Sequence, residues 1–266
     1  MSGVLLFAGV CPPLTALSYK FSTVSSAVYG PGGVALDASG VIFVTAPSGQ
    51  AVYKLSPAGV ILAQYGSGTF TSAGLLDGAG TAARFSNPRG IALDTSGNIF
   101  VADSGNHAIR KITPAGAVTT VVGAAAAAGA IDGPATTARL NAPEGIAVDA
   151  AGNVFVADTG NHAIRRIAPS GVVTTFAGAL GSAGDANGAG PVARFNAPQG
   201  LAIDAVGNLF VADTGNHVIR RITPAGIVSL VAGRAGSRGL IDDLGVLARF
   251  TAPQGVAVDA AGNVFV

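Results

Sequence analysis

The chain has 266 residues, of which 49% are apolar and 11% are charged, and its formal net charge is +1. This length and apolar content can form a buried core, although an ordinary soluble domain carries about 25% charged residues. Glu occurs once and Lys three times against 39 Gly, which excludes a coiled coil. The small net charge gives no electrostatic reason to expect nucleic acid or an anionic membrane as a partner.

The first feature along the chain is a short apolar run, Val4 to Val10, which no Lys or Arg precedes. Signal peptides begin with a positively charged region, so this run does not predict one. The longer uncharged stretch, residues 112–131, is interrupted by Pro114 and three glycines, and we do not expect it to span a membrane. A lone cysteine, Cys11, cannot form an internal disulfide. These features predict no particular compartment.

The dominant pattern is a Pro-x-Gly triplet that is followed by apolar-Ala-apolar-Asp. It occurs five times, and its prolines lie 57, 55, 55 and 55 residues apart, at Pro31, Pro88, Pro143, Pro198 and Pro253. A period of this length is typical of solenoids, propellers and other repeat arrays. The chain is therefore expected to be built from repeated units.

Each unit contains apolar runs of four to six residues that are rich in Val, Ile and Phe and bounded by Gly, Asp, Asn or Pro. Such runs favour strands over helices. Four antiparallel strands per unit would form one small sheet, and radial packing would cover both of its faces, which explains the low charge. We predict an all-β fold, a β-propeller of four-stranded antiparallel blades, with four complete blades and a partial fifth.

The blades are expected to start at residues 31, 88, 143, 198 and 253, the last one truncated, so that 31–266 is the propeller and 1–30 is a partial preceding blade and connection. Ser2 to Gly9 is similar to the fourth-strand segment Ser170 to Gly178, whereas Pro253 to Val266 supplies two strands. We therefore expect a fragment of a longer propeller. An open apolar strand edge would promote its self-association.

Three turns share the pattern Asp-[Ser/Thr]-Gly-Asn-His and lead into an Ile-Arg-[Lys/Arg]-Ile strand. With these motifs the chain resembles the NHL repeat family of β-propellers over residues 31–266. It departs from the family where Ala or Val follows His in place of Leu, and where the first repeat has Ser48-Gly49-Gln50. The resemblance implies an innermost first strand and a channel-mouth face that carries the connections and these turns. It also implies binding of proteins, RNA or small ligands, with catalysis in a minority of members.

The histidines look like a metal set, but each occupies the same slot of a different blade. Packed sheets lie about 10 Å apart, whereas nitrogen ligands lie about 2.0–2.1 Å from zinc. We therefore predict no shared metal. The Asn-His pairs are expected to be structural: Asn106, His107, Asn161, His162, Asn216 and His217.

An Arg recurs four residues before each marker Pro from the second repeat onward, with Asp or Asn seven residues before it. We expect these arginines to hold the long connections through ion pairs or backbone contacts: Arg84, Arg139, Arg194 and Arg249. The Asp residues of the two turns are expected to form Asx-type hydrogen bonds with the turn backbone. They are Asp94, Asp149, Asp204 and Asp259 in the first turn, and Asp103, Asp158 and Asp213 in the second.

No connection carries the carboxylate cluster that calcium requires, and neither a metal nor a cofactor is predicted. Paired basic residues recur in the third strand: Arg110-Lys111, Arg165-Arg166 and Arg220-Arg221. Adjacent residues on a strand point to opposite faces, so these pairs form no single basic patch. Few aromatic residues lie nearby for base stacking, and nucleic acid is not expected as a partner.

The slot between Pro and Gly varies although the repeat around it is uniform; it holds Gly32, Arg89, Glu144, Gln199 and Gln254. The family geometry implies that these side chains surround the channel mouth, where they could converge on a ligand or simply form a solvated ring. We find no nucleophile elbow, phosphate loop or paired glutamates, and no residue is predicted to be catalytic. We favour a non-enzymatic binding or scaffold module for a protein or small ligand. The alternatives are a metal-assisted lactonase or lyase of propeller fold, and RNA binding.

Overall fold

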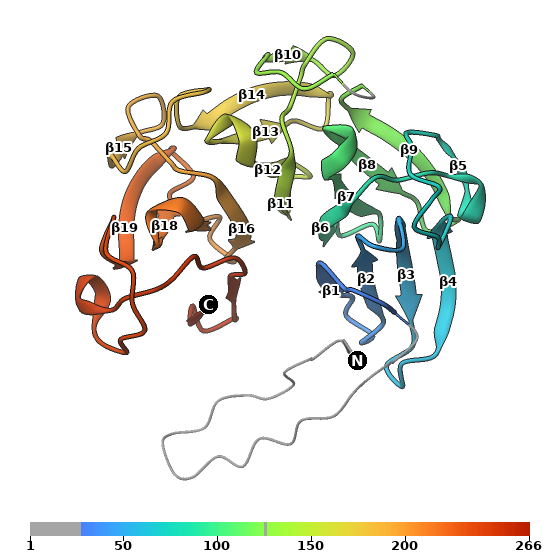
Figure 1. Ribbon diagram of the computed structural model, residues 1–266, viewed down its shortest axis with the longest axis horizontal. Coiled ribbons are helices and arrows are strands. Elements are labelled where there is room, and N and C mark those ends of the chain that lie inside the picture. Colours follow the sequence, from blue (N-terminus) through green and yellow to red (C-terminus); the bar gives the residue numbers. More distant parts are fainter. Residues whose placement is uncertain (1–27, 125–126) are drawn as a thin grey trace.

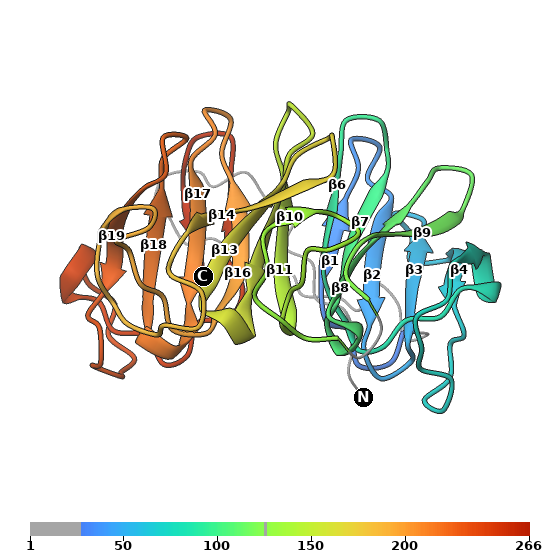
Figure 2. The same cartoon turned by 90° about the horizontal axis from the view of Figure 1, so that it is seen from above.

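A computed structural model describes residues 28–124 and 127–266. Four antiparallel sheets stand side by side in an arc around a common centre, and a two-stranded sheet follows them (Figure 1). In the perpendicular view the inner strands of these sheets lie roughly along one common axis (Figure 2). The predicted fold is confirmed: the chain forms an all-β propeller of antiparallel blades.

We name the four sheets blades A to D, and in each the four main strands lie side by side in chain order. Blade A consists of β1 (Val34–Leu36), β2 (Ile42–Ala46), β3 (Ala51–Leu55) and β4 (Ile61–Gly66). Blade B contains β6 (Pro88–Leu93), β7 (Ile99–Asp103), β8 (Ala108–Ile112) and β9 (Ala117–Val122). Blade C contains β11 (Pro143–Val148), β12 (Val154–Asp158), β13 (Ala163–Ile167) and β14 (Val172–Ala177). Blade D contains β16 (Pro198–Ile203), β17 (Leu209–Asp213), β18 (Val218–Ile222) and β19 (Ile227–Gly233).

Blades B, C and D each have a fifth strand of two residues, which the sequence analysis missed. These strands come from the connection before each blade and are β5 (Gly78–Ala79), β10 (Gly133–Pro134) and β15 (Gly188–Ala189). Each pairs with the outer main strand of its blade; for example, Gly78 lies opposite Val118. Two small residues make no apolar run, so the sequence carried no signal for this addition. The connections are therefore part of the sheets.

The first strand of each blade lies nearest the centre of the arc (Figure 1). Here successive blades approach through their backbones: a Cβ on Gly90 would collide with the carbonyl oxygen of Glu144. The same contact recurs between Gly145 and the carbonyl of Gln199, and between Gly200 and that of Gln254. The Gly of the Pro-x-Gly triplet is therefore required because only a residue without a side chain allows this approach.

The apolar core lies between the blades. Between blades C and D, Phe155 and Ile164 pack against Phe195 and Val211, and equivalent clusters fill the interfaces between A and B and between B and C. Both faces of the inner blades are thus covered, which agrees with their low charge.

After blade D the chain forms β20 (Ala257–Val258) and β21 (Val264–Phe265), which pair as the first two strands expected of a fifth blade. The segment expected to resemble a fourth strand, Ser2 to Gly9, lies outside the described residues. Within the residues that are described, no helix is long and apolar enough to cross a membrane.

Candidate functional site

In blades B to D a short 3-10 helix joins the second and third strands, namely η2 (Ser104–Asn106), η3 (Thr159–Asn161) and η4 (Thr214–Asn216). The residue that ends it, His107 in blade B, has a φ of 54° and so turns the chain back in the left-handed conformation. The Asp before the helix is fully buried, and Asn106 is only 6% exposed. This recurring turn is thus largely buried, with only its Gly exposed in blades B and C.

The Asp before this helix is the centre of a hydrogen-bond cluster. In blade B, Asp103 Oδ1 accepts the backbone N–H of Ser86 at 2.7 Å, and Oδ2 accepts Asn106 Nδ2 at 2.8 Å and Arg110 Nη1 at 3.0 Å. The prediction of an Asx turn is therefore wrong for Asp103, and likewise for Asp158 and Asp213, which make the same contacts. In the first turn the prediction is confirmed: Asp94 Oδ1 accepts the N–H groups of Ser96 and Asn98.

The third-strand arginine joins this cluster to the connection that precedes the blade. Arg110 is fully buried, lies 5.0 Å from the ring centre of Phe85, and donates to the carbonyl oxygens of Leu76 and Arg84. It also forms a second ion pair with Asp77 of the connection, at 2.9 Å. Arg165 pairs with Asp158 and Asp132 at 2.7 and 2.6 Å, and Arg220 with Asp213 at 3.0 Å. These buried arginines tie each connection to its blade.

Burial shifts the titration of the central carboxylates. It raises the pKa of Asp103 and of Asp213 to about 6, although Asn106 and Arg110, and their equivalents in blade D, lower it. Burial also raises the pKa of Asp158. A charged group in a low-dielectric interior is costly even when it is paired, which is the physical cause of this direction.

The four arginines that were expected to hold the connections through ion pairs or backbone contacts make backbone contacts, and none of them forms an ion pair with a described residue. Arg84 makes backbone contacts and donates Nη1 to the carbonyl oxygens of Thr81, Ala82 and Ala83 around η1 (Gly80–Ala82). Arg139, Arg194 and Arg249 make the same kind of local contact. The ion pair with Asp77 is made by Arg110, because that carboxylate lies against the outer strands of the blade, where it also accepts the N–H of Thr120.

The histidines connect neighbouring blades. His107 Nδ1 accepts the backbone N–H of Ala142, which precedes the first strand of blade C, at 3.0 Å. His162 and His217 make the same contact with Ala197 and Ala252. In blade A, Gln50 occupies this slot with a φ of 51° and accepts the N–H of Asn87 through Oε1 at 2.6 Å. Among the described residues, no three His, Cys, Asp or Glu side chains cluster in a way that could hold a metal ion.

The variable Pro-x-Gly residues lie at the start of the inner strands, on successive blades. Arg89 and Gln254 are exposed, and Glu144 and Gln199 are half-buried. Burial raises the pKa of Glu144 and the charge of Arg89 lowers it, which indicates that these two neighbours interact. Gly32 has no side chain at this position. Arg89, Glu144, Gln199 and Gln254 thus occupy equivalent positions of successive blades, and we call this set the polar ring.

Sequence reasoning missed the buried arginines and the inter-blade hydroxyl contacts. Ser104 Oγ donates to the carbonyl oxygen of Pro143 at 2.6 Å, and Thr159 and Thr214 donate likewise to the carbonyls of Pro198 and Pro253. A signal was available, because Asp, Ser/Thr, Asn and Arg recur together at constant spacing in three blades. The two members of each basic pair were predicted to point to opposite faces of the strand, and in blade B Arg110 is buried whereas Lys111 is only half-buried.

The NHL repeat family model matches three stretches, residues 85–112, 140–167 and 195–222. The chain carries NHL repeats. Each matched stretch of this NHL-repeat chain begins at the end of a connection and covers the first three strands of blade B, C or D.

One curated relative, "NHL repeat-containing protein 2" of Bos taurus, is 36% identical over 151 residues, which cover 52% of this chain and 21% of the relative. The chain therefore matches about a fifth of that protein's length. Among solved structures, one is a Bacteroides thetaiotaomicron protein of unknown function with a TM-score of 0.70 and 21% identity, covering 92% of this chain and 57% of the other. Another is virginiamycin B lyase of Staphylococcus aureus, with a TM-score of 0.59 and 15% identity, covering 88% and 62%. At these identities the two structures show a shared fold alone.

Proposed function

We propose that this chain is a non-enzymatic binding module of the NHL-propeller type that recognises a protein or small ligand through the polar ring. The observation that carries the proposal is that none of the four ring side chains makes a hydrogen bond with another described residue, although the charge of Arg89 acts on Glu144. Asn106, Ser104 and Arg110, which lie in the same blade as Arg89, all do. Polar groups that the fold leaves unused at one end of a channel are available to a ligand.

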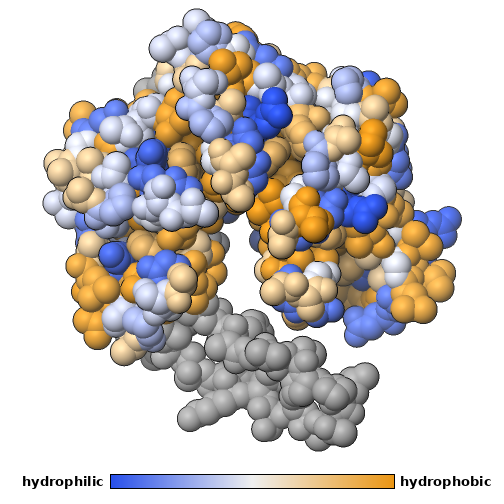
Figure 3. All heavy atoms as spheres, turned by 180° about the vertical axis from the view of Figure 1, so that it is seen from behind, coloured by the Kyte–Doolittle hydropathy of each residue, from blue (hydrophilic) through white to orange (hydrophobic). Residues whose placement is uncertain are grey.

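The chemistry of the ring favours a ligand with mixed polarity. Arg89 supplies donors only, Glu144 supplies acceptors when it is ionised, and the amides of Gln199 and Gln254 supply both. The carboxylate of Glu144 opposes a polyanion such as RNA. Hydrophilic and apolar areas alternate on the face shown in Figure 3. The formal net charge is only +1, whereas nucleic-acid-binding domains are strongly basic. We therefore place a protein or a neutral polar ligand before RNA.

The experiment compares ring variants with a core variant. Purified chain is screened on a glycan array and against secreted proteins, and each candidate that binds is measured again with Arg89→Ala and Glu144→Ala. Both variants should weaken binding by about tenfold without lowering the melting temperature, since each removes a charged hydrogen-bonding group from an open site. Arg110→Ala should lower the melting temperature and leave the affinity of the folded fraction unchanged.

Unchanged affinity in both ring variants would remove the channel-mouth proposal. The metal-assisted lactonase or lyase alternative has a separate test, the metal content of the purified chain. One tightly held calcium or zinc ion per chain would favour that alternative over a binding module.

A further inference from the structure

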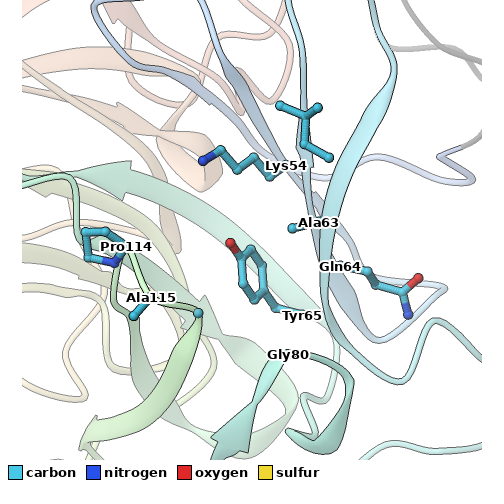
Figure 4. Close-up of a pocket in the computed structure, with 9 residues that line it drawn as sticks. Lys54, Ala63, Gln64, Tyr65, Gly80, Pro114 and Ala115 are labelled. Carbon is cyan, nitrogen blue, oxygen red and sulfur yellow. The ribbon is translucent and has the colours of Figure 1, made fainter.

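A pocket of about 360 Å³ opens between blades A and B, away from the polar ring. Lys54 of β3, residues 62–65 of β4, Gly80, and the turn Pro114 to Gly116 before β9 line it. In Figure 4, Lys54 and Tyr65 extend from blade A toward Pro114 and Ala115, whereas Gln64 points to the other side of β4. Its volume is at the lower end of the range of small-molecule sites.

Blade A departs from the other blades at this pocket. In blades B, C and D the outer main strand has a bulge that leaves one residue without a cross-strand partner: Val121, Phe176 and Val231. In blade A, Lys54 lies opposite Ala63 and Leu55 opposite Ile61, so the bulged residue is Leu62. The bulge has therefore moved two positions along the repeat and lies in the pocket wall. Bulges re-aim side chains and are frequent beside functional sites.

Tyr65 is also particular to blade A. The equivalent residues, opposite the second residue of the third strand, are Val122, Ala177 and Ala232, so an aromatic ring at this position is found only in blade A, where it joins the apolar cluster between blades A and B. The Tyr65 ring is 6% exposed and packs close to Gly116, where an added Cβ would lie 3.3 Å from Tyr65 Cε1. A tyrosine phenol is already a neutral hydrogen-bond donor near pH 7, and burial raises the pKa of Tyr65 further above its ordinary value.

The charge in the pocket is positive. No Asp or Glu lines it, and neither Lys54 nor Tyr65 makes a side-chain hydrogen bond to another described residue. Lys54 lies 5.8 Å from the ring centre of Phe43 and contributes to lowering the pKa of Asp37, but it forms no ion pair with it. Asp37 already accepts hydrogen bonds from Ser39 and Val41. An ammonium and a phenol hydroxyl thus face an apolar wall formed by Pro114, Ala115 and Ala63.

We infer that this pocket binds a small organic carboxylate. Its carboxylate would accept hydrogen bonds from Lys54 Nζ and the Tyr65 hydroxyl, and its compact apolar body would pack on Pro114 and Ala115. A charge-assisted pair of this kind is among the stronger single contacts in a protein. The same carboxylate is carried by free organic acids and by the C-terminus of a peptide chain, and the test separates these two sources.

The test uses the isotope-labelled full chain and follows its amide signals by NMR during titration with benzoate. We expect saturable shifts at Gly80, Ala115 and Gly116. Lys54→Gln should weaken benzoate binding by about tenfold and Tyr65→Phe by about threefold, since the first removes the charge and the second only a hydroxyl. The matched control, Lys111→Gln, changes the equivalent residue of blade B and should leave the affinity unchanged. Spectra of the free variants show whether each remains folded.

Three further ligands, benzyl alcohol, N-acetylphenylalanine and the amide of N-acetylphenylalanine, complete the experiment. Benzyl alcohol has a similar body without the carboxylate, and N-acetylphenylalanine presents the C-terminus of a chain. Tighter binding of N-acetylphenylalanine than of its amide and of benzoate would assign the site to chain termini, and tighter binding of benzoate would assign it to free acids. Equal binding of benzyl alcohol and benzoate, equal affinity of wild type and Lys54→Gln, or shifts that do not saturate would each overturn the inference.

Discussion

In blades B to D the turn between the second and third strands holds both the preceding connection and the next blade, whereas in blade A it holds only the next blade. Blades B to D have Asp, Asn and Arg at the positions that tie the preceding connection to the sheet, whereas blade A has Ala46, Gly49 and Tyr53 there. The contact to the next blade is nevertheless kept in blade A, because Gln50 replaces His and accepts the N–H of Asn87. One turn therefore makes two separable sets of contacts, one with the preceding connection and one with the next blade. A repeat can lack the first set and keep the second.

The largest effect is expected from breaking the Arg cluster. Arg165→Ala in blade C should lower the free energy of unfolding by about 3–5 kcal/mol, because Asp158 would remain buried without its cation. Tyr53→Ala at the equivalent position of blade A should cost only about 1–2 kcal/mol of packing. Urea denaturation of both variants gives the comparison. If Arg165→Ala does not fold, Arg165→Lys is measured in its place. This variant keeps the positive charge, and its loss of unfolding free energy should lie between the losses expected for Arg165→Ala and Tyr53→Ala. Equal losses of unfolding free energy in the Arg165 and Tyr53 variants would contradict the role of the buried arginine in tying the connection to the blade.

The second effect concerns pH. The pKa of Asp103 and Asp213 in the folded chain, about 6, lies above the ordinary value of 3.8, so the folded state takes up protons first. Their contribution to stability is therefore complete below about pH 4 and is lost as the pH rises through 6, by roughly 1–3 kcal/mol per group. Blade A, with Ala46, contributes nothing of this kind.

This contribution is measured as the difference between wild type and an Asp103→Asn, Asp213→Asn double variant in unfolding free energy from pH 4.5 to 7. The histidines and the other carboxylates are common to both proteins and cancel. Wild type should lose stability over this range more steeply than the variant. Parallel profiles would show that the two carboxylates titrate at their ordinary pKa.

The smallest effect is expected where blade A has already made the substitution. His162→Gln should change the unfolding free energy by less than about 0.5 kcal/mol, because Gln50 accepts the equivalent bond in the same backbone conformation. His162→Ala should cost about 1–2 kcal/mol, since the N–H of Ala197 loses its acceptor. Thermal and urea unfolding of the pair separate these values. A loss of similar size in both variants would show that the imidazole has a role that Gln cannot take.

The repeat made the fold predictable, but not the partners within it. The strands of each repeat and the Asp94 type of turn follow from local composition and spacing, which recur from blade to blade. Which arginine pairs with Asp77, Arg84 or Arg110, could not be predicted in this way, because the pairing depends on how the connection folds back over β8 and β9. The displaced bulge at Leu62 was equally hidden, since register depends on cross-strand packing and not on any one residue type.

Only some residues of the two candidate sites could be singled out from the sequence. Arg89 and Glu144 stood out because the slot varies within a uniform repeat, whereas Lys54 and Tyr65 did not, since Lys54 has a basic equivalent in every complete blade. Their meeting with Pro114 depends on how blade A packs against blade B, which no periodicity in the sequence encodes.

The backbone contact at the centre of the propeller has an evolutionary consequence. Neighbouring blades meet there through a glycine and a carbonyl oxygen, so the side chain that belongs to that carbonyl takes no part in the contact. When a blade is duplicated, its frame is copied intact while this one side chain remains free to diverge. Under the proposed function, a new specificity would then arise by single substitutions in this slot, one blade at a time.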